Sequence, residues 1–378
     1  MINAQHPNIE DSEGSVAGRI KSVRNLGNIL FIDVNVEGQL VQGVFKEDNL
    51  GKDLYTESQL LKEEYLVRIS GEMSRSKKRT ISIDVKSYDL ISKSLKEHRG
   101  LITNPEYIRV RSDILFYTRD YLRHKGFIEV EIPVIYRGTT SSSSREFTTK
   151  HNNLGEQLSL RKSMDLFMRR LSIQDFDKIY SIGQNFRNEP ITKDKLPEFT
   201  MLTVLGNYML MEEVIGFSRD LAGEVSKKIG KNDAEFNKNY DIVTFKDFVR
   251  DFVNTDIPYN SAKRAKGSPT FVYSFPFNTN SIARTDVAGN LREFKLIMGG
   301  STIIHGYEEI TDPKELRERL IAQGGNLDNT ELEELLKEMN YEAPPATSFG
   351  LSIDRLTMFL SGAKSIKEVI AFPFSRLR

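Results

Sequence analysis

Two apolar runs on either side of a charged loop make residues 180–205, YSIGQNFRNEPITKDKLPEFTMLTVL, the most constraining stretch of the chain. Tyr180, Ile182 and Phe186 alternate with polar neighbours, as in a strand with one buried face. The second apolar run covers residues 201–205, and prolines interrupt the polar loop between the runs. The pattern predicts two antiparallel strands joined by a long loop, and such loops in compact domains are usually functional.

Arg187 follows the first of these runs directly, and we expect it to be buried at the end of the strand. Its planar guanidinium carries a fork of donors that suits a carboxylate or a phosphate. Two interpretations are open here. Arg187 binds an anionic substrate, or it pairs with Glu189 or Glu198 and ties the loop down, since structural ion pairs resemble binding sites.

The overall charge of the chain gives no sign of a nucleic-acid partner. The 378 residues include 53 basic and 53 acidic side chains, so any such contact must come from local patches. No apolar run reaches membrane-spanning length and no secretion signal opens the chain, which favours a cytoplasmic protein without a membrane partner. The absence of cysteine excludes disulfides and thiolate chemistry, and five scattered histidines do not predict a zinc site.

The N-terminal part of the chain reads as short strands. Apolar and polar residues alternate in segments over residues 15–92, and Gly27, Gly38 and Gly71 stand among the turn-rich joints. This pattern is typical of a small antiparallel barrel. A polar connection then leads into a longer part with mixed helix and strand patterns, so the length divides into at least two domains.

Two motifs resemble those of the class II aminoacyl-tRNA synthetases. FRNE followed by LPEFT, within residues 186–200, resembles motif 2, and GLSIDRLTMFL at residues 350–360 resembles motif 3. Two such motifs in this order are far more specific than either alone. The lysyl-tRNA synthetase branch is the most similar, with the aspartyl and asparaginyl enzymes as cousins. The resemblance implies an all-β OB-fold barrel over residues 1–95, then an α+β catalytic domain, an antiparallel sheet flanked by helices, over residues 96–378.

The barrel segment VAGRIKSVRNLGNILFIDV resembles the OB-fold with which these enzymes grip the anticodon, which implies tRNA as a partner. OB-folds bind single strands through aromatic stacking and a basic groove. The residues implied here are Arg24, Phe31, Arg75, Lys77, Lys78 and Arg79. Alternatively, Phe31 is a core residue and the basic run is a solvated hairpin tip. A glutamine of the family aligns with Val41, one place before Gln42.

A helix pattern over residues 108–122, stopped by Gly126, precedes a strand that ends at Pro133. This arrangement resembles motif 1, which builds the dimer interface in the family, and it implies a homodimer. The alternative is an ordinary core helix and strand.

The resemblance assigns the catalytic and ATP-binding roles to motifs 2 and 3. It implies that Arg187 holds the α-phosphate and the substrate carboxylate, that Arg355 holds the γ-phosphate and that Phe199 stacks on adenine. Glu189 belongs to the same implied nucleotide site. ATP is therefore the expected cofactor.

An amino-acid-like substrate is implied by a second group of aligned residues. Asp165 falls where the family has a glutamate that binds the α-amino group, and residues 140–144 replace a turn that approaches the amino acid. His305, Tyr307 and Glu309 align with an asparagine, an aromatic residue and a glutamate of the lysine pocket.

The side-chain end of this pocket departs from the family. Thr203 and Leu205 replace a glutamate and a tyrosine. An ammonium group buried against Leu205 would lack a partner, at a cost of several kcal/mol, so ordinary lysine is not the expected substrate.

The expected magnesium ligands depart from the family too, and no metal ligand is assigned. The family's Mg²⁺ carboxylates align with Lys295 and Thr302. Magnesium prefers oxygen anions and an ammonium group repels it. Glu293, Glu308 and Glu309 are the nearby carboxylates from which another site would have to be built, although a one-residue slip in a strand turns a side chain to the other face.

Three functional classes remain. The favoured one is an enzyme that adenylates an amino acid with ATP and passes it to tRNA or another acceptor. The second is a non-catalytic paralog with a degenerate metal site that binds tRNA or another ligand. A structural or regulatory dimer is favoured least, because Arg187, Phe199 and Arg355 are all present.

Overall fold

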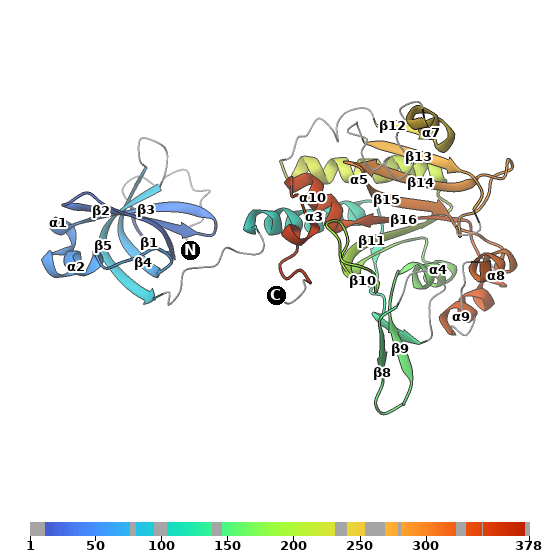
Figure 1. Ribbon diagram of the computed structural model, residues 1–378, viewed down its shortest axis with the longest axis horizontal. Coiled ribbons are helices and arrows are strands. Elements are labelled where there is room, and N and C mark those ends of the chain that lie inside the picture. The colour runs from blue at the N-terminus through green and yellow to red at the C-terminus, as the bar shows by residue number, and fades with distance from the viewer. Residues whose placement is uncertain are drawn as a thin grey trace. The chain divides into compact units, whose positions relative to one another are not determined.

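The computed structural model describes residues 12–75, 81–93, 104–137, 146–230, 240–253, 269–278, 281–322, 330–341 and 343–374. The chain divides into two compact units, Met1–Leu101 and Ile102–Arg378, and each is described by itself (Figure 1). The domain boundary expected at residues 95 and 96 lies outside the described residues.

The first unit is a closed five-stranded barrel, which confirms the predicted OB-fold architecture. Its strands follow the order β1-β2-β3-β5-β4 and comprise β1 (Ser12–Asn25), β2 (Ile29–Val36), β3 (Gln39–Lys46), β4 (Leu66–Arg75) and β5 (Ile81–Ser92). Along β2, Leu30, Ile32 and Val34 point into the barrel core, while Phe31 and Asp33 between them are only partly buried. Two short helices that the sequence did not predict, α1 (Glu47–Leu50) and α2 (Lys52–Ser58), follow β3.

The second unit is built on an eight-stranded sheet of order β12-β13-β14-β15-β16-β11-β10-β6 (Figure 1). The strands are β6 (Ile128–Glu129), β10 (Lys178–Phe186), β11 (Glu198–Asn207), β12 (Asp241–Thr244), β13 (Thr270–Phe275), β14 (Leu291–Met298), β15 (Ser301–Glu308) and β16 (Ala346–Ser352). Only the pairs at the two edges, β6 with β10 and β12 with β13, are parallel. The pairing of β10 with β11 confirms the antiparallel strands predicted for residues 180–205.

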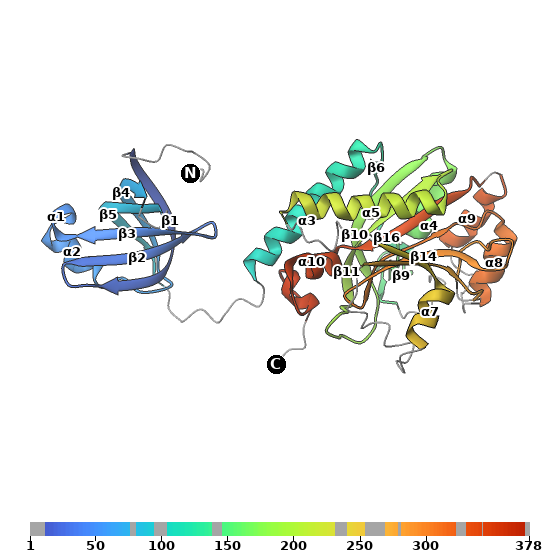
Figure 2. The ribbon, with the colours of Figure 1, turned by 90° about the horizontal axis from the view of Figure 1, so that it is seen from above.

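Three helices cover one face of this sheet: α3 (Pro105–His124), α5 (Met211–Lys228) and α10 (Ile353–Ser361). Helices α3 and α5 contact each other and cross at an angle (Figure 2). The start of α3 follows from Asn104, which accepts the N–H of Glu106, and from Pro105 in the first turn. Helix α10 begins after Ser352 and ends at Gly362, whose left-handed backbone favours glycine.

The opposite face carries the remaining elements of the second unit. These are α4 (Asp165–Ile173), α8 (Pro313–Ala322), α9 (Thr330–Met339), α7 (Phe245–Val253), and the small sheet of β7 (Ile135–Arg137), β9 (Gln157–Leu160) and β8 (Thr148–Lys150). The 3-10 helix η2 (Ile366–Val369) packs against α10 and α3. Successive side chains of a strand point to opposite faces. In β16, Phe349 and Leu351 therefore join the core under α5, while Ser348, Gly350 and Ser352 face a pocket.

None of the helices in the described ranges is long and apolar enough to cross a membrane.

Candidate active site

A pocket of about 420 Å³ lies on the second face of the large sheet, over β10, β11, β14, β15 and β16. It brings together most of the site residues predicted from the sequence. Its walls include the predicted residues Asp165, Arg187, Glu189, Phe199, Thr203, Lys295, Thr302, His305, Tyr307 and Arg355. Residues separated by up to 190 positions in the sequence thus line one cavity.

Arg187 lies at the mouth of the pocket. The prediction that it is buried is wrong: the side chain is exposed, because β10 ends at Phe186 and the chain turns out toward solvent. Its guanidinium carbon lies 5.3 Å from the centre of the Phe199 ring, close enough for a cation–π contact. Glu189 pairs with Lys195 at 3.7 Å instead, and within the described residues Arg187 forms no ion pair. Its donors therefore remain available to an anion.

Arg355 enters the same pocket from the first turn of α10. Its Nη1 donates to the carbonyl of Thr302 at 2.8 Å, which fixes the direction of the side chain. Burial lowers the pKa of Arg355, whereas Asp194 and Asp354 favour the charged form. A cation held in a desolvated place binds anions more strongly than one in water. The positive charge of Arg187 also lowers the pKa of Arg355. The two guanidinium groups are therefore close enough to bind one anionic ligand together.

Asp354 is a residue of motif 3 to which the sequence analysis gave no role. The carboxylate is fully buried, accepts Nη1 of Arg111 at 2.6 Å and accepts the backbone N–H of Thr200 at 2.9 Å. These contacts join α3, β11 and α10 directly behind Phe199 and Arg355. Asp354 thus positions both motifs from the far side of the sheet.

The pocket wall also contains a carboxylate. Asp165, the first residue of α4, lies on the wall beside Ser163. Burial raises the pKa of Asp165, and the hydrogen bond from Ser163 and the charges of His305 and Arg187 oppose this rise. A positively charged group of a bound ligand would stabilise the ionised form of Asp165 in this environment. Thr203 is also in the wall, whereas Leu205 packs with Met168 in a core cluster.

Glu309 lies one hydrogen bond behind the pocket surface rather than on it. Ser348, which lines the pocket, donates to Glu309 Oε1 at 2.6 Å. Burial raises the pKa of Glu309 to about 7, although Arg169 and Ser348 favour the ionised form. Burial also raises the pKa of Tyr307, and the neighbouring Asp165 and Glu309 add to that rise. The predicted substrate contact of Glu309 would therefore be made through Ser348.

Asn185 lines the pocket and was missed by the sequence analysis. It is 3 % exposed, and its Oδ1 has no hydrogen-bond partner among the described residues. Buried polar atoms in folded proteins almost always have a partner, so an unpaired one in a pocket wall suits a ligand donor. The only sequence signal was its position two residues before Arg187, on an alternating strand.

The residues at the expected magnesium positions do not fit a divalent cation. Lys295 and Thr302 both line the pocket, and a register shift between β14 and β15 brings Thr302 opposite Ile297. Lys295 Nζ lies 2.9 Å from Glu293 Oε1, which places an ammonium group on the nearest carboxylate of β14. In the described part of the chain, no group of three or more His, Asp and Glu side chains is arranged to hold a metal ion.

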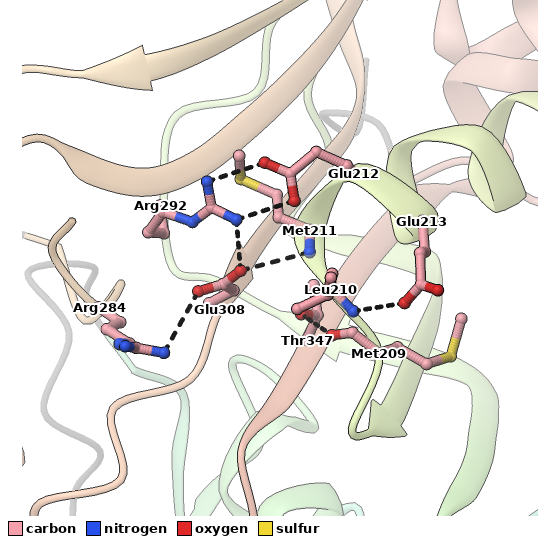
Figure 3. A network of polar contacts seen from close by, with 9 residues as sticks. All are labelled: Met209, Leu210, Met211, Glu212, Glu213, Arg284, Arg292, Glu308 and Thr347. Atoms are coloured by element: carbon pink, nitrogen blue, oxygen red, sulfur yellow. Dashed lines mark hydrogen bonds and ion pairs between the residues drawn. The ribbon is translucent and has the colours of Figure 1, made fainter.

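Glu308 is not a substitute ligand, because it points to the other face of the sheet. It accepts Arg292 Nη2 at 2.7 Å and the N–H of Met211 at 3.3 Å, and it pairs with Arg284 at 3.7 Å (Figure 3). This network joins β15 to the start of α5, away from the pocket. Because successive side chains of a strand point to opposite faces, Glu308 points away from the pocket that Tyr307 lines.

The outer surface of the barrel carries the part of the predicted nucleic-acid site that the structure describes. Arg24 lies opposite Phe31, with its guanidinium carbon 6.0 Å from the ring centre, and pairs with Asp33 at 3.2 Å. Phe31 is partly exposed and is not a core residue. Gln42 donates to Asp33 at 3.2 Å and shares this surface, whereas Val41 is in the core. Of the predicted basic run, the backbone of Arg75 ends β4, and Lys77, Lys78 and Arg79 lie outside the described residues.

Comparison with known proteins gives the same division of the chain. The family model described as tRNA synthetases class II (D, K and N) matches residues 102–376, and the OB-fold nucleic acid binding domain matches residues 15–91. The chain therefore belongs to the class II tRNA synthetase family, of the branch for aspartate, lysine and asparagine.

Within that family the chain is similar to lysine–tRNA ligases. It is 28% identical to lysine–tRNA ligase 2 of Methanosarcina mazei, with 96% of this chain and 86% of the relative covered. Identity to the lysine–tRNA ligase of Listeria innocua is also 28%, with 97% and 88% covered. A crystal structure of asparaginyl-tRNA synthetase from Pyrococcus horikoshii, complexed with asparaginyl-adenylate, matches the fold with a TM-score of 0.87 at 17% identity, over 98% of this chain and 97% of that one.

Proposed function

We propose that this protein activates an amino acid with ATP and transfers it to tRNA or another acceptor. In the first step a carboxylate oxygen of the amino acid attacks the α-phosphorus of ATP. The bond from that phosphorus to the β-phosphate oxygen breaks, and pyrophosphate leaves. The observation that carries the proposal is one pocket whose wall contains two arginines, an aromatic ring and a partly buried carboxylate, Asp165.

The charge distribution of the pocket supports this step. Arg187 and Arg355 would hold the phosphates, with Phe199 against the adenine, and Asp165 would receive the α-amino group. A site of this kind works by positioning two reactants and by stabilising the charge that develops on the phosphate. The asparaginyl-adenylate in the structure of the archaeal relative supports an adenylate as the ligand of this fold.

We infer that the substrate is an amino acid other than ordinary lysine. Thr203 provides a hydroxyl where the family has a carboxylate, whereas Leu205 packs in an apolar cluster and does not line the pocket. The hydroxyl of Ser348 stands between the cavity and Glu309. An extended ammonium side chain would have no carboxylate in direct contact there, while a shorter polar side chain would be bound by the hydroxyl groups.

Calorimetric titration with ATP tests the nucleotide part of the proposal. Arg355→Ala removes a charge-assisted contact of about 1.5–3 kcal/mol, so we expect ATP affinity to fall by roughly ten- to a hundredfold. Arg219→Ala, which removes an exposed arginine of α5, should leave the affinity unchanged. Equal affinity for the wild type and Arg355→Ala would remove Arg355 from the site.

A non-catalytic paralog is the second candidate function. The observation in its favour is the replacement of the expected metal carboxylates by Lys295 and Thr302. Such a protein would keep ATP or tRNA binding and would exchange no pyrophosphate with any amino acid.

We propose that the protein works as a cytoplasmic homodimer that binds tRNA through its barrel. Three apolar side chains are exposed on elements at or next to the segment that resembles motif 1: Phe116 of α3 is 63% exposed, Ile128 of β6 53% and Ile135 of β7 50%. Among the described strands, edge strand β6 pairs on one side only, with β10. A second copy would cover this surface, and sedimentation as a monomer at micromolar concentration would contradict the dimer.

A further inference from the structure

Three charged or ionisable side chains on β14 and β15 form a closed cluster at the edge of the pocket. Lys295 Nζ and His305 Nε2 each lie 2.9 Å from the same oxygen of Glu293, Oε1. The hydroxyl of Ser281 donates to the second oxygen at 3.0 Å. Lys295 and His305 are register partners, so the pairing of the two strands sets this geometry. Both oxygens of Glu293 are thereby engaged.

The cluster keeps Glu293 ionised and occupies both of its carboxylate oxygens. Although burial alone would raise its pKa, His305 and Lys295 lower the pKa of Glu293 to about 2. A hard divalent ion binds a carboxylate oxygen at about 2.0–2.6 Å. It would have to displace the ammonium group of Lys295 from that oxygen and then remain beside it. Two cations at such a distance repel each other strongly in a partly buried site.

Lys295 itself is held in place by neutral and charged neighbours. Its Nζ lies 4.5 Å from the centre of the Phe275 ring, in addition to the contact with Glu293. Its side chain is 31% exposed and lines the pocket that also contains Arg187 and Arg355. A lysine with this combination of anchors presents a fixed point charge to the pocket.

We propose that Lys295 supplies, at this edge of the pocket, the positive charge that a divalent ion would otherwise bring to a bound polyphosphate. The inference rests on the proposed ATP binding and deepens it: the chain binds the magnesium-free nucleoside triphosphate. Lys295, Arg187 and Arg355 then surround the phosphates from β14, β10 and α10. The carbonyl of Thr302 on β15 holds the side chain of Arg355 in this place.

Calorimetric titration of the whole protein with ATP, once with excess EDTA and once with excess Mg²⁺, tests the proposal. The affinity of the wild type for ATP in EDTA should be no more than about threefold weaker than in Mg²⁺, because fixed cations supply the charge. Lys295→Met should weaken binding in EDTA by about tenfold or more, while Lys227→Met on the exposed side of α5 should not. Lys295→Glu should make ATP binding depend on Mg²⁺.

The possible results separate the inference from the proposed function. Wild-type affinity that falls tenfold or more in EDTA would overturn the role of Lys295 and leave ATP binding intact. No binding of ATP in either medium would overturn the proposed ATP site and the inference with it. Melting curves identify a Lys295 variant that does not fold. In that case the ATP affinities of the wild type in EDTA and in Mg²⁺ still test the inference.

Discussion

At the scale of single residues, Glu309 has the protonation equilibrium that is easiest to observe. Burial raises its pKa to about 7 from the ordinary value of 4.5. Because the folded protein holds this proton more tightly than the unfolded chain does, ionisation of Glu309 costs stability. The cost begins near pH 4.5 and is complete above pH 7. A shift of this size corresponds to about 3 kcal/mol.

We therefore expect Glu309→Gln to melt at a higher temperature than the wild type at pH 8 and at nearly the same temperature at pH 4.5. The amide keeps an acceptor for the Ser348 hydroxyl and removes the charge. Thermal unfolding followed by circular dichroism at both pH values measures the difference. Glu224→Gln, at an exposed position of α5, is the control. If the difference in melting temperature between Glu309→Gln and the wild type is the same at pH 4.5 and pH 8, the carboxylate of Glu309 has an ordinary pKa.

At the scale of elements, one buried ion pair holds motifs 2 and 3 together. Asp354 of α10 is bound by Arg111 of α3 and by the backbone of Thr200 in β11. Removal of Arg111 leaves a buried carboxylate without its cation. We expect Arg111→Ala to destabilise the second unit by about 3–5 kcal/mol. Chemical denaturation measures this value, and the double variant Arg111→Ala, Asp354→Asn should recover part of it. A loss below about 1 kcal/mol would be typical of an exposed pair and would contradict the account.

The barrel strands make a separate prediction for RNA. Phe31 and Arg24 lie side by side on the outer surface of β2 and β1, where a base can stack. We expect Phe31→Ala to weaken binding of single-stranded tRNA anticodon loops by about 1–3 kcal/mol, and all binding to weaken with salt. Filter binding at several salt concentrations measures both effects. Leu60→Ala, at an exposed residue of the same unit, should have no effect. Binding that does not change with salt, or equal RNA affinity of Phe31→Ala and the wild type, would contradict RNA binding at this surface of the barrel.

The same elements show which features the sequence could predict. The alternation in β10 and β11 and the periodicity of α3 are local signals, and the predicted strands and helix were confirmed. Helices α1 and α2 have four and seven residues, too few for a periodic pattern. The contacts of Glu293 with Lys295 and His305 depend on the register of β14 and β15, which no local pattern encodes. The exposure of Arg187 likewise depends on how the loop leaves β10.

At the scale of the whole molecule, the proposed RNA binding and the proposed amino acid chemistry belong to separate cores. The barrel has its own apolar cluster, and the candidate active site lies entirely within Ile102–Arg378. Each unit can therefore be altered without removing the other's ligand site. Phe31→Ala should leave ATP binding unchanged, and Arg355→Ala should leave RNA binding unchanged.

Amino-acid-dependent exchange of pyrophosphate into ATP, measured over a panel of amino acids, tests adenylation by this protein directly. We expect exchange with an amino acid other than lysine, and loss of that exchange in Arg187→Ala. Lysine-dependent exchange at rates usual for synthetases would contradict the inference that the substrate is not ordinary lysine. Intact ATP binding without exchange for any amino acid would contradict adenylation and select the non-catalytic paralog.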